Sequence, residues 1–425
     1  MPEIDPAGSA TPREVGVALI GYGTVGQGVA ALLADHHDQW VAALGLDVRV
    51  RHVVVRDAGA PRDVPAPAGS LTTDAAAAVA DPAVQVVIEV AGMVDEGRHL
   101  LADALRAGKH VVTANKALLS AHGEELTGLA QEHGVNLLFE AAVAGGVPVV
   151  RGLRDLVRVD HVHTVEGILN GSCNYILTAM SEGTDYETVA ARAQELGYLE
   201  ADPTADVSGA DSLRKLRLLA SMAFGGPVLE EDIDCTGIDR ITAADILALK
   251  AAPGGPREVR LLGRVQLVEP GGQAYTAVVE PVAVPQDHWA TGILGSTNAV
   301  TLGADHVGAL TFSGPGAGRY ETASAVLTDL VDVLLGTVPT ASPLGDRALR
   351  NARDEVTGRW YVRSSDALSD QLEPLLERTH LTGPLSGLTR VVARDELAPW
   401  LDDPESCVIG WEPAAHDLDP EEAAR

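Results

Sequence analysis

The feature that most constrains the fold is the glycine-rich segment Gly21-Tyr22-Gly23-Thr24-Val25-Gly26. An apolar, β-branched run over 15–20 leads directly into it, and a helical pattern over 25–35 follows it. In that context Gly21 permits a tight turn, Gly23 lets the backbone approach a pyrophosphate, and Gly26 lets the helix pack on the strand. The helix N-terminus then offers N–H groups and a positive dipole end to phosphates. The segment therefore predicts a dinucleotide-binding loop, with its six residues as cofactor contacts, rather than a purely structural turn.

Further apolar runs at 48–55, 84–90, 110–113 and 135–139 alternate with helical stretches such as 95–107 and 116–132. The runs are continuous rather than alternating, which is typical of parallel strands covered on both faces. The intervening helices end near glycines in C-cap positions. The pattern predicts an α/β fold with a doubly wound parallel sheet, the Rossmann arrangement.

The pattern changes after that domain. Helical stretches at 174–182, 186–196 and 208–224 precede extended segments at 257–268 and 274–281, which predicts an α+β domain whose sheet could pair with a second copy. A proline- and charge-rich stretch after 342 leads to a small strand–helix unit, a strand at 360–363 and a helix at 366–377. We expect four parts: a tail (1–14), a dinucleotide-binding domain (15–152, completed by 313–342), a substrate-binding and dimerisation domain (153–312), and a small C-terminal region (343–425).

Composition narrows the class of partner. The formal net charge is −29, from 31 basic and 60 acidic residues, and so acidic a surface repels nucleic acid and anionic membranes. The three cysteines, Cys173, Cys235 and Cys407, lie far apart without metal-ligand spacing, which fits a reducing compartment. No segment resembles a signal peptide or a membrane span. We expect a cytoplasmic enzyme that acts on a small molecule.

The type of dinucleotide is read at the end of the second strand, where Arg56 precedes Asp57. An arginine there accommodates a 2′-phosphate, whereas an acid binds a ribose 2′-hydroxyl. The order favours NADP and leaves NAD open, and either residue taken singly could also be a solvated charge.

Two motifs suggest chemistry beside the cofactor. Asn115 and Lys116 follow the run at 110–113, and ligands sit outside the carboxyl ends of parallel strands. A lysine at a helix start opposes the dipole, so it is not expected there without a function. The segment at 197–206 is dense in carboxylates, and Asp211 and Lys215 share one helix face by their i,i+4 spacing. A surface ion pair explains that spacing equally well.

Glycine-rich turns occur at 144–148, just after Glu140, and at 314–318. Each can bring backbone groups to a ligand, and carbonyls beside a carboxylate could hold a hard cation.

Four segments together resemble homoserine dehydrogenase, in that family's order and over roughly residues 15–340. They are VTANKALL at 112–119, FEAAVAGGVP at 139–148, GILNGSCNYIL at 167–177 and LGYLEADPT at 196–204. The resemblance implies reversible NAD(P)-linked interconversion of aspartate 4-semialdehyde and homoserine, on the route to threonine and methionine, by a homodimer.

The resemblance also implies roles for matching residues. Lys215 would be the acid/base, with Lys116 beside it and Asn115 at the cofactor. Glu200, Asp206 and Asp211 would hold the substrate ammonium or orient the lysine, with Tyr198 alongside. Glu140 and the carbonyls of Val143, Gly145 and Val147 match a sodium-type site, and Gly316 would close over the cofactor.

The chain departs from the family in three places. Ser172 replaces a usual threonine, Arg319-Tyr320-Glu321 replaces a usual proline–threonine pair after Gly318, and 363–368 lacks the glycine of an ACT-type domain. The C-terminal region is therefore interpreted as degenerate relative to that domain. Two alternatives remain: a dehydrogenase of the same fold for another amino-acid semialdehyde, and a non-catalytic dinucleotide-binding regulator. Lys116, Glu200, Asp211 and Lys215 argue against the regulator.

Overall fold

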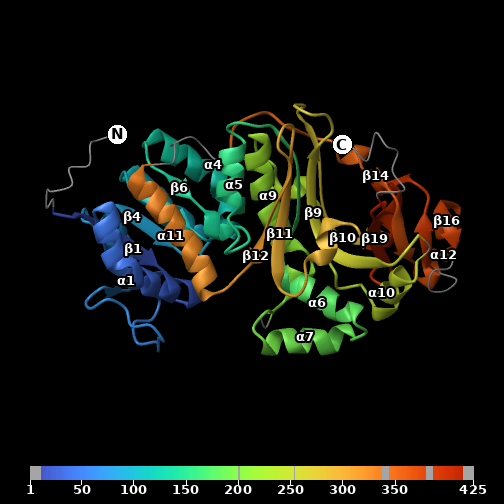
Figure 1. Cartoon of the computed structure of the whole chain (residues 1–425), viewed down its shortest axis with the longest axis horizontal. Helices are drawn as coiled ribbons and strands as arrows, with labels where there is room; N and C mark the ends of the chain where they lie inside the picture. Colours follow the sequence, from blue (N-terminus) through green and yellow to red (C-terminus); the bar gives the residue numbers. More distant parts are fainter. Residues whose placement is uncertain (1–10, 200–201, 253, 337–343, 380–385, 415–425) are drawn as a thin grey trace. The chain divides into compact units, whose positions relative to one another are not determined.

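A computed structural model describes residues 11–199, 202–252, 254–336, 344–379 and 386–414. The chain forms two compact units, one extending to Gly146 and resuming at Ala317, the other spanning Val147–Gly316 and resuming at Leu344. Each unit is built around its own sheet (Figure 1). The residues from Leu344 onward belong to the second unit, where the sequence suggests a separate region.

The first unit contains a six-stranded parallel sheet in the order β3-β2-β1-β4-β5-β6. The doubly wound parallel sheet predicted from the sequence is confirmed. Because chain order reverses direction between β1 and β4, the loops after these strands flank the crevice where such sheets bind ligands. The strands are β1 (Arg13–Ile20), β2 (Leu46–Val54), β3 (Leu71–Thr72), β4 (Val86–Glu89), β5 (His110–Thr113) and β6 (Leu137–Leu138).

The helices of this unit are α1 (Thr24–Leu44), α2 (Ala75–Ala80), α3 (Asp95–Arg106), α4 (Lys116–Glu132) and, after the chain returns, α11 (Arg319–Leu335). Helices α1 and α11 pack at Gly28, where an added Cβ would lie 2.4 Å from the Arg319 carbonyl oxygen. Helix α11 contributes Val326 and Leu330, both fully buried, to the same core as β1. The returning segment therefore completes the first unit.

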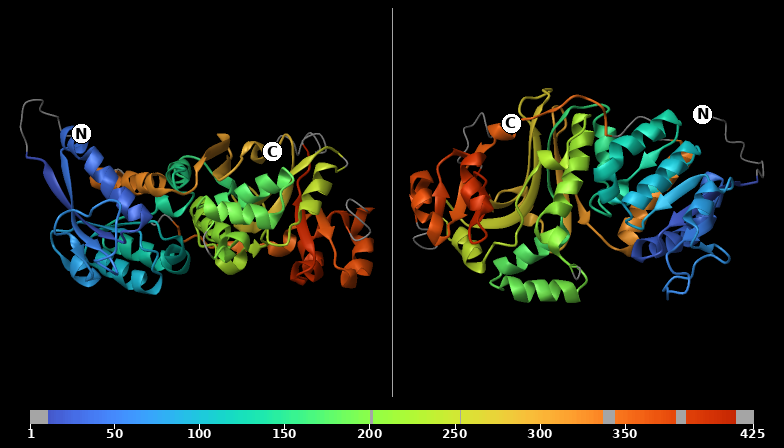
Figure 2. Two further views of the ribbon diagram at one scale, coloured as in Figure 1. Left: turned by 90° about the horizontal axis from the view of Figure 1, so that it is seen from below. Right: turned by 180° about the vertical axis from the view of Figure 1, so that it is seen from behind.

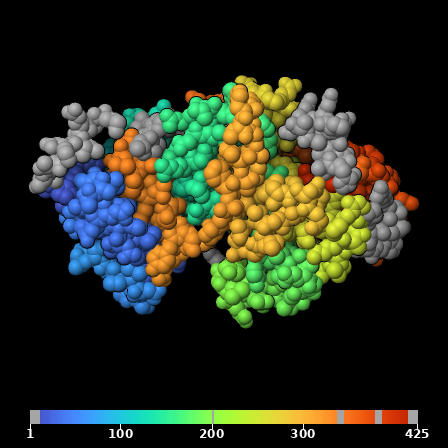
Figure 3. Space-filling view, viewed as in Figure 1, coloured from blue at the N-terminus to red at the C-terminus, as the bar shows by residue number. Residues whose placement is uncertain are grey.

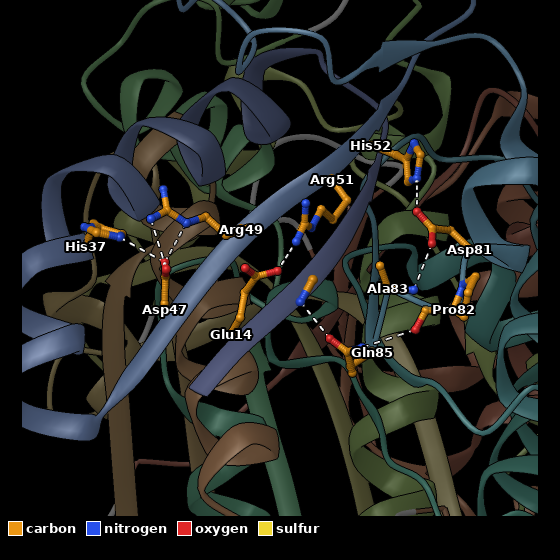
Figure 4. A network of polar contacts seen from close by, with 11 residues as sticks. Glu14, His37, Asp47, Arg49, Arg51, His52, Asp81, Pro82, Ala83 and Gln85 are labelled. Atoms are coloured by element: carbon orange, nitrogen blue, oxygen red, sulfur yellow. Dashed lines mark hydrogen bonds and ion pairs between the residues drawn. The ribbon is translucent and has the colours of Figure 1, made fainter. Parts of the chain in front are cut away.

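Polar contacts join the strands at the amino end of this sheet (Figure 4). Glu14 of β1, expected in the tail, forms an ion pair with Arg51 of β2. The Gly16 amide donates to Gln85 Oε1 (2.7 Å), just before β4. An added Cβ on Gly16 would lie 1.8 Å from the Ala83 carbonyl oxygen, so the chain can approach this closely only at a glycine. These contacts lie at the end of the sheet opposite the glycine loop.

The second unit contains a mixed sheet in the order β12-β11-β7-β9-β10-β19-β15-β17-β16, and Figure 2 shows it from two further sides. The α+β character predicted for this part is confirmed. The core strands are β7 (Val162–Ile168), β9 (Arg257–Leu267), β10 (Ala274–Pro285), β11 (Thr297–Ala304) and β12 (Gly308–Pro315). The helices before the C-terminal part are α5 (Val149–Leu156), α6 (Gly171–Ser181), α7 (Tyr186–Glu195), α8 (Thr204–Val207), α9 (Ala210–Phe224) and α10 (Ala243–Lys250). The short helices α12 (Ser369–Leu372) and α13 (Ala398–Asp402) follow in that part.

The C-terminal strands continue this sheet. Strand β19 (Cys407–Trp411) pairs with β10 through Val282 and Ala283, and β15 (Trp360–Arg363) pairs with β19. Strand β17 (Ser386–Thr389) pairs with the other side of β15. The helix expected over 366–377 is wrong: 3₁₀ turns flank the four-residue α12 (Ser369–Leu372), and strand β16 (Leu376–Thr379) follows. Pro374 explains the break, because a proline inside an α-helix has no N–H to donate to the i−4 carbonyl and its ring clashes with the preceding turn.

A buried ion pair crosses the middle of the sheet. Glu166 of β7 lies opposite Arg264 of β9, and their side chains meet at 2.5 Å. The other carboxylate oxygen accepts from the Trp289 indole N–H (2.9 Å). Burial alone would raise the pKa of Glu166, but Arg264 and His288 lower that pKa to about 2. The unit therefore encloses a carboxylate that stays ionised.

The β11–β12 hairpin lies on the face of the second unit seen in Figure 3. Its turn is held by Asp160, which accepts from the amides of His306 and Val307 and from His306 Nδ1 (2.9 Å). The His306 ring and these amides lower the pKa of Asp160. His161 and Asp305 lie beside it, and with Asp160 they form a group of possible metal ligands. Because the Asp160 oxygens already accept several hydrogen bonds, we interpret the group as the closure of the hairpin.

Across the part of the chain that the structure describes, no helix has both the length and the apolar character of a membrane span.

Candidate active site

The glycine loop of the first unit has the geometry expected of a dinucleotide site. Gly21 has φ +96°, and an added Cβ would lie 2.8 Å from the Ala91 amide nitrogen. An added Cβ on Gly26 would lie 2.2 Å from the Gly21 carbonyl oxygen, whereas one on Gly23 would meet nothing within 4 Å. Gly21 and Gly26 are therefore required by the protein itself, and Gly23 leaves open space beside the backbone.

The loop continues into α1, whose N-cap is Gly23. Because Gly23 has no side chain to cap the helix, the amides of Thr24, Val25 and Gly26 at its start can face a phosphate. The Tyr22 side chain is buried and donates to the Pro65 carbonyl (3.3 Å), and Gln27 Oε1 accepts from the Val64 amide (2.9 Å). These bonds join the glycine loop to the segment that follows β2.

That segment carries Arg56 and Asp57, the residues from which the sequence predicts the type of dinucleotide. Arg56 is exposed, whereas Asp57 turns its carboxylate back to accept from the Gly59 amide (2.8 Å). Arg62, which no sequence motif marks, donates to the Asp57 carbonyl (2.6 Å). Arg319 of α11 pairs with Asp63 at 2.6 Å, so the unusual residues after Gly318 have a structural partner.

Asn115 and Lys116 lie at the carboxyl end of β5, where α4 begins. Asn115 Oδ1 accepts from the Leu118 amide (3.1 Å), which caps the helix, and Asn115 Nδ2 donates to the Met93 carbonyl (2.8 Å). Lys116 is the first residue of α4 and is partly exposed. Asn115 therefore fixes the start of the helix that carries the lysine.

In the second unit, Lys215 is surrounded by acceptors. It lies on α9 and is 9% exposed, and its Nζ is 2.7 Å from Asp211 Oδ2 and 2.7 Å from the Leu169 carbonyl oxygen. Asp211 is 6% exposed. The i,i+4 pair is thus a buried pair rather than a surface one. Asn298 donates to the same Leu169 carbonyl (3.0 Å), so this oxygen connects α9 with β11.

Asn170, directly after β7, joins the two carboxylates predicted to act on substrate. Its Nδ2 donates to Asp206 Oδ1 (2.7 Å) and to Asp211 Oδ2 (2.8 Å), and its Oδ1 caps α6 through the Cys173 amide (2.8 Å). The sequence motifs alone do not indicate a role for Asn170. The signal was present in its position between a strand and a helix start, a preferred N-cap site for asparagine.

Tyr198 lies near the start of α6. The Ser172 hydroxyl donates to the Tyr198 carbonyl. The serine that stands in place of the family's usual threonine therefore makes a hydrogen bond through its hydroxyl. The Tyr198 ring is 5.2 Å from that of Tyr175, and 42% of the residue is exposed. Glu200, predicted to bind the substrate ammonium, lies outside the described residues.

Cys173 lies beside the Lys215 cluster but is not suited to be a nucleophile. It is fully buried, and its thiol donates to the Asp206 carbonyl (3.2 Å). Burial, followed by the charges of Asp206 and Asp211, raises its pKa well above the ordinary value. It therefore remains a protonated packing residue.

The predicted cation loop follows β6. Glu140 is 2% exposed, and its amide donates to Asp329 Oδ2 (2.7 Å). Ala144 and Gly145 have positive φ angles of 56° and 53°, which turn the backbone of this segment. Val143 and Gly145 belong to the first unit, whereas Val147 is the first residue of the second. Gly316 also belongs to the second unit, where it packs against Asn298.

Comparison with known families decides the identity of this fold. A family model described as "Homoserine dehydrogenase, NAD binding domain" matches residues 21–140, and one described as "Homoserine dehydrogenase" matches residues 148–331. The chain belongs to the homoserine dehydrogenase family. It is thus an oxidoreductase that acts on a CH–OH group, and its first unit carries the family's NAD-binding domain.

Individual members agree with this assignment. A homoserine dehydrogenase of Corynebacterium glutamicum is 41% identical over 402 residues, which is 93% of this chain and 89% of that protein. The crystal structure of a homoserine dehydrogenase from Thiobacillus denitrificans superposes with a TM-score of 0.81 at 30% identity, covering 94% of this chain and 98% of that one. A hyperthermophilic archaeal homoserine dehydrogenase in complex with NADPH has a TM-score of 0.64 at 25% identity, covering 77% of this chain and 100% of that one.

The resemblance found in the sequence is therefore confirmed over most of the chain. Neither a regulator without activity nor a dehydrogenase for another semialdehyde is favoured by homoserine dehydrogenase relatives of this extent.

Proposed function

We propose that Lys215 is the acid/base in a reversible, NADP-linked reduction of L-aspartate 4-semialdehyde to L-homoserine. The bound nicotinamide would supply a hydride to the aldehyde carbon. As the π electrons of the carbonyl move onto its oxygen, Lys215 Nζ would give that oxygen a proton. A cationic donor lowers the barrier because negative charge develops on the oxygen.

The observation that carries this proposal is the environment of Lys215 Nζ. Two acceptors 2.7 Å away, Asp211 and the Leu169 carbonyl, account for two of the three N–H directions of an ammonium. The third direction can serve a substrate oxygen. Asp206, held by Asn170, offers a carboxylate for the substrate ammonium, together with Glu200 and alongside Tyr198. Lys116 would help to position cofactor and substrate.

The preference for NADP rests on Arg56. Arg56 is exposed just after β2, whereas the Asp57 carboxylate accepts a hydrogen bond from the Gly59 amide. The NADPH complex of the archaeal relative agrees with this choice. Replacing Arg56 with alanine should raise the KM for NADP about tenfold and leave the KM for NAD unchanged, since one charge-assisted contact to phosphate is lost. Arg49→Ala, which removes a pair with Asp47 elsewhere on β2, is the control.

Three further features complete the proposal. A sodium-type cation would be held by the Glu140 carboxylate and the carbonyls of Val143, Gly145 and Val147, an oxygen donor set that suits a hard ion. A homodimer would form through the sheet, in which β12 is an edge strand. The free thiols of the three cysteines favour the cytoplasm.

The test is an assay of the purified chain with L-homoserine and either NADP or NAD, following the absorbance of the reduced cofactor. We expect homoserine-dependent reduction of NADP, and reduction of NAD at a lower kcat/KM. Absence of turnover with both cofactors, in protein that binds NADPH, would contradict the proposal.

A further inference from the structure

Glu89 is a fully buried carboxylate at the carboxyl end of β4. Strand β4 lies between β1, which leads into the glycine loop, and β5, which leads to Asn115 and Lys116. Glu89 pairs with Ile20 on one side and with Thr113 on the other. It therefore occupies the centre of the edge where this unit is expected to bind its cofactor.

Each oxygen of Glu89 holds a different segment. Oε1 accepts from the amides of Ala91 (2.8 Å) and Gly92 (2.9 Å), in the loop that follows β4. Oε2 accepts from the Thr113 hydroxyl (2.7 Å), at the end of β5. Burial raises the pKa of Glu89, opposed by the hydrogen bonds from Thr113, Ala91 and Gly92.

Both segments touch parts of the dinucleotide site. The Ala91 backbone packs against Gly21, whose added Cβ would lie 2.8 Å from the Ala91 nitrogen. On the other side, Thr113 Oγ1 accepts from the Asn115 amide (3.0 Å), and Asn115 caps the helix that Lys116 begins. Asn115 Nδ2 returns to the Met93 carbonyl (2.8 Å), so the contacts close into a ring.

We propose that Glu89 is a positioning residue that fixes the glycine loop relative to the segment carrying Asn115 and Lys116. This inference rests on the proposed function. A carboxylate suits the position because it accepts at both oxygens, whereas an amide presents a donor on one side. With glutamine at 89, either the two loop amides or the Thr113 hydroxyl would lose an acceptor in a fully buried place, and the loops would shift.

The first test is Glu89→Gln, with the exposed Glu96→Gln on α3 as its matched control. We expect Glu89→Gln to weaken NADPH binding about tenfold and to lower kcat with homoserine by about ten- to 100-fold, because small displacements near reacting groups cost rate steeply. Glu96→Gln should change neither. Wild-type Kd and kcat in Glu89→Gln would overturn the proposal.

A second pair of variants separates positioning from mere stability, and it remains decisive if Glu89→Gln does not fold. Thr113→Val keeps the shape and loses the hydroxyl, whereas Thr113→Ser keeps the hydroxyl and loses a methyl group. We expect Thr113→Val to weaken NADPH binding and lower kcat about tenfold, and Thr113→Ser to stay within about threefold of wild type. Equal losses in the two variants, in proportion to their Tm, would overturn the proposal. Because NADPH binding is measured without homoserine, the result stands apart from the identity of the substrate.

Discussion

The glycine loop of the first unit and the Lys215 cluster of the second are built from different parts of the chain. The loop depends on backbone: Gly21 and Gly26 are pressed against neighbouring main chain, and Gly23 leaves space beside it. The cluster depends on side chains: Lys215, Asp211 and Asn170 are each less than a tenth exposed, and Asp211 accepts hydrogen bonds from the other two. A shape set by backbone tolerates no Cβ, whereas a buried charge tolerates no loss of its partner. Substitutions at the two sites should therefore have different effects on binding, turnover and stability.

The largest effect is expected from Lys215→Ala. Loss of the proton donor should lower kcat by about 10²- to 10⁴-fold, the range typical of general acid catalysis. The Kd for NADPH should stay within about twofold of wild type, because Lys215 lies in the second unit and the glycine loop lies in the first. Steady-state kinetics and NADPH titration measure the two quantities. Lys250→Ala removes a lysine of the same unit that bonds to the Ser181 carbonyl, and it should retain activity. Retained turnover in Lys215→Ala would refute its role.

In the glycine loop, substitutions at Gly26 and Gly23 should have different effects, the first on stability and the second on NADPH binding. Gly26→Ala places a Cβ 2.2 Å from the Gly21 oxygen, so we expect Tm to fall by several °C, as overpacking costs about 1–3 kcal/mol. Gly23→Ala meets open space, so Tm should hardly change while the Kd for NADPH rises about tenfold. Thermal unfolding and NADPH titration of both variants distinguish the outcomes. A Gly23→Ala variant that binds NADPH normally would show that the cofactor does not approach there.

The smallest effect concerns pH. The pKa of Glu166 is about 2 in the folded protein, below its ordinary value, so its stabilising effect is complete above about pH 4.5. It is lost as pH falls towards 2. We expect Glu166→Gln to lower Tm by a few °C at pH 7 and to flatten the fall of Tm between about pH 4.5 and 2. Glu187→Gln, at an exposed position on α7, should change neither. An unchanged acid profile in Glu166→Gln would assign the acid sensitivity to other groups.

The sequence predicts features that depend on local pattern. Helix α4, strand β5 and strand β15 lie at the expected bounds, because cap residues and continuous apolar runs mark them. The glycine loop is equally local, since six consecutive residues between a strand and a helix specify it. The helix expected over 366–377 is wrong for a local reason as well, because Pro374 interrupts the helical pattern within that segment.

The sequence does not predict contacts that depend on the topology of the sheets. Asn170 meets Asp211 across 41 residues and Lys215 shares the Leu169 carbonyl across 46, so neither contact leaves a pattern along the chain. From the sequence, Glu89 is only a residue near the end of a buried strand. Its role depends on the segments that its carboxylate contacts in the folded sheet. The i,i+4 spacing of Asp211 and Lys215 fits a surface helix as well as a buried one, and only the packing of α9 in its unit decides between them.

The edge of β10 that faces away from β9 determines whether the C-terminal strands could be deleted or exchanged. One side of this strand pairs with β9 over Tyr275–Pro285, but the other is covered in pieces by β8 (Asp234–Cys235), β13 (Arg350–Asn351) and β19. Two of these three pieces come from the C-terminal segment. Deleting that segment would leave a long strand with free backbone groups, a template for aggregation. In evolutionary and engineering terms, these last strands are an integral part of the second unit rather than an exchangeable module.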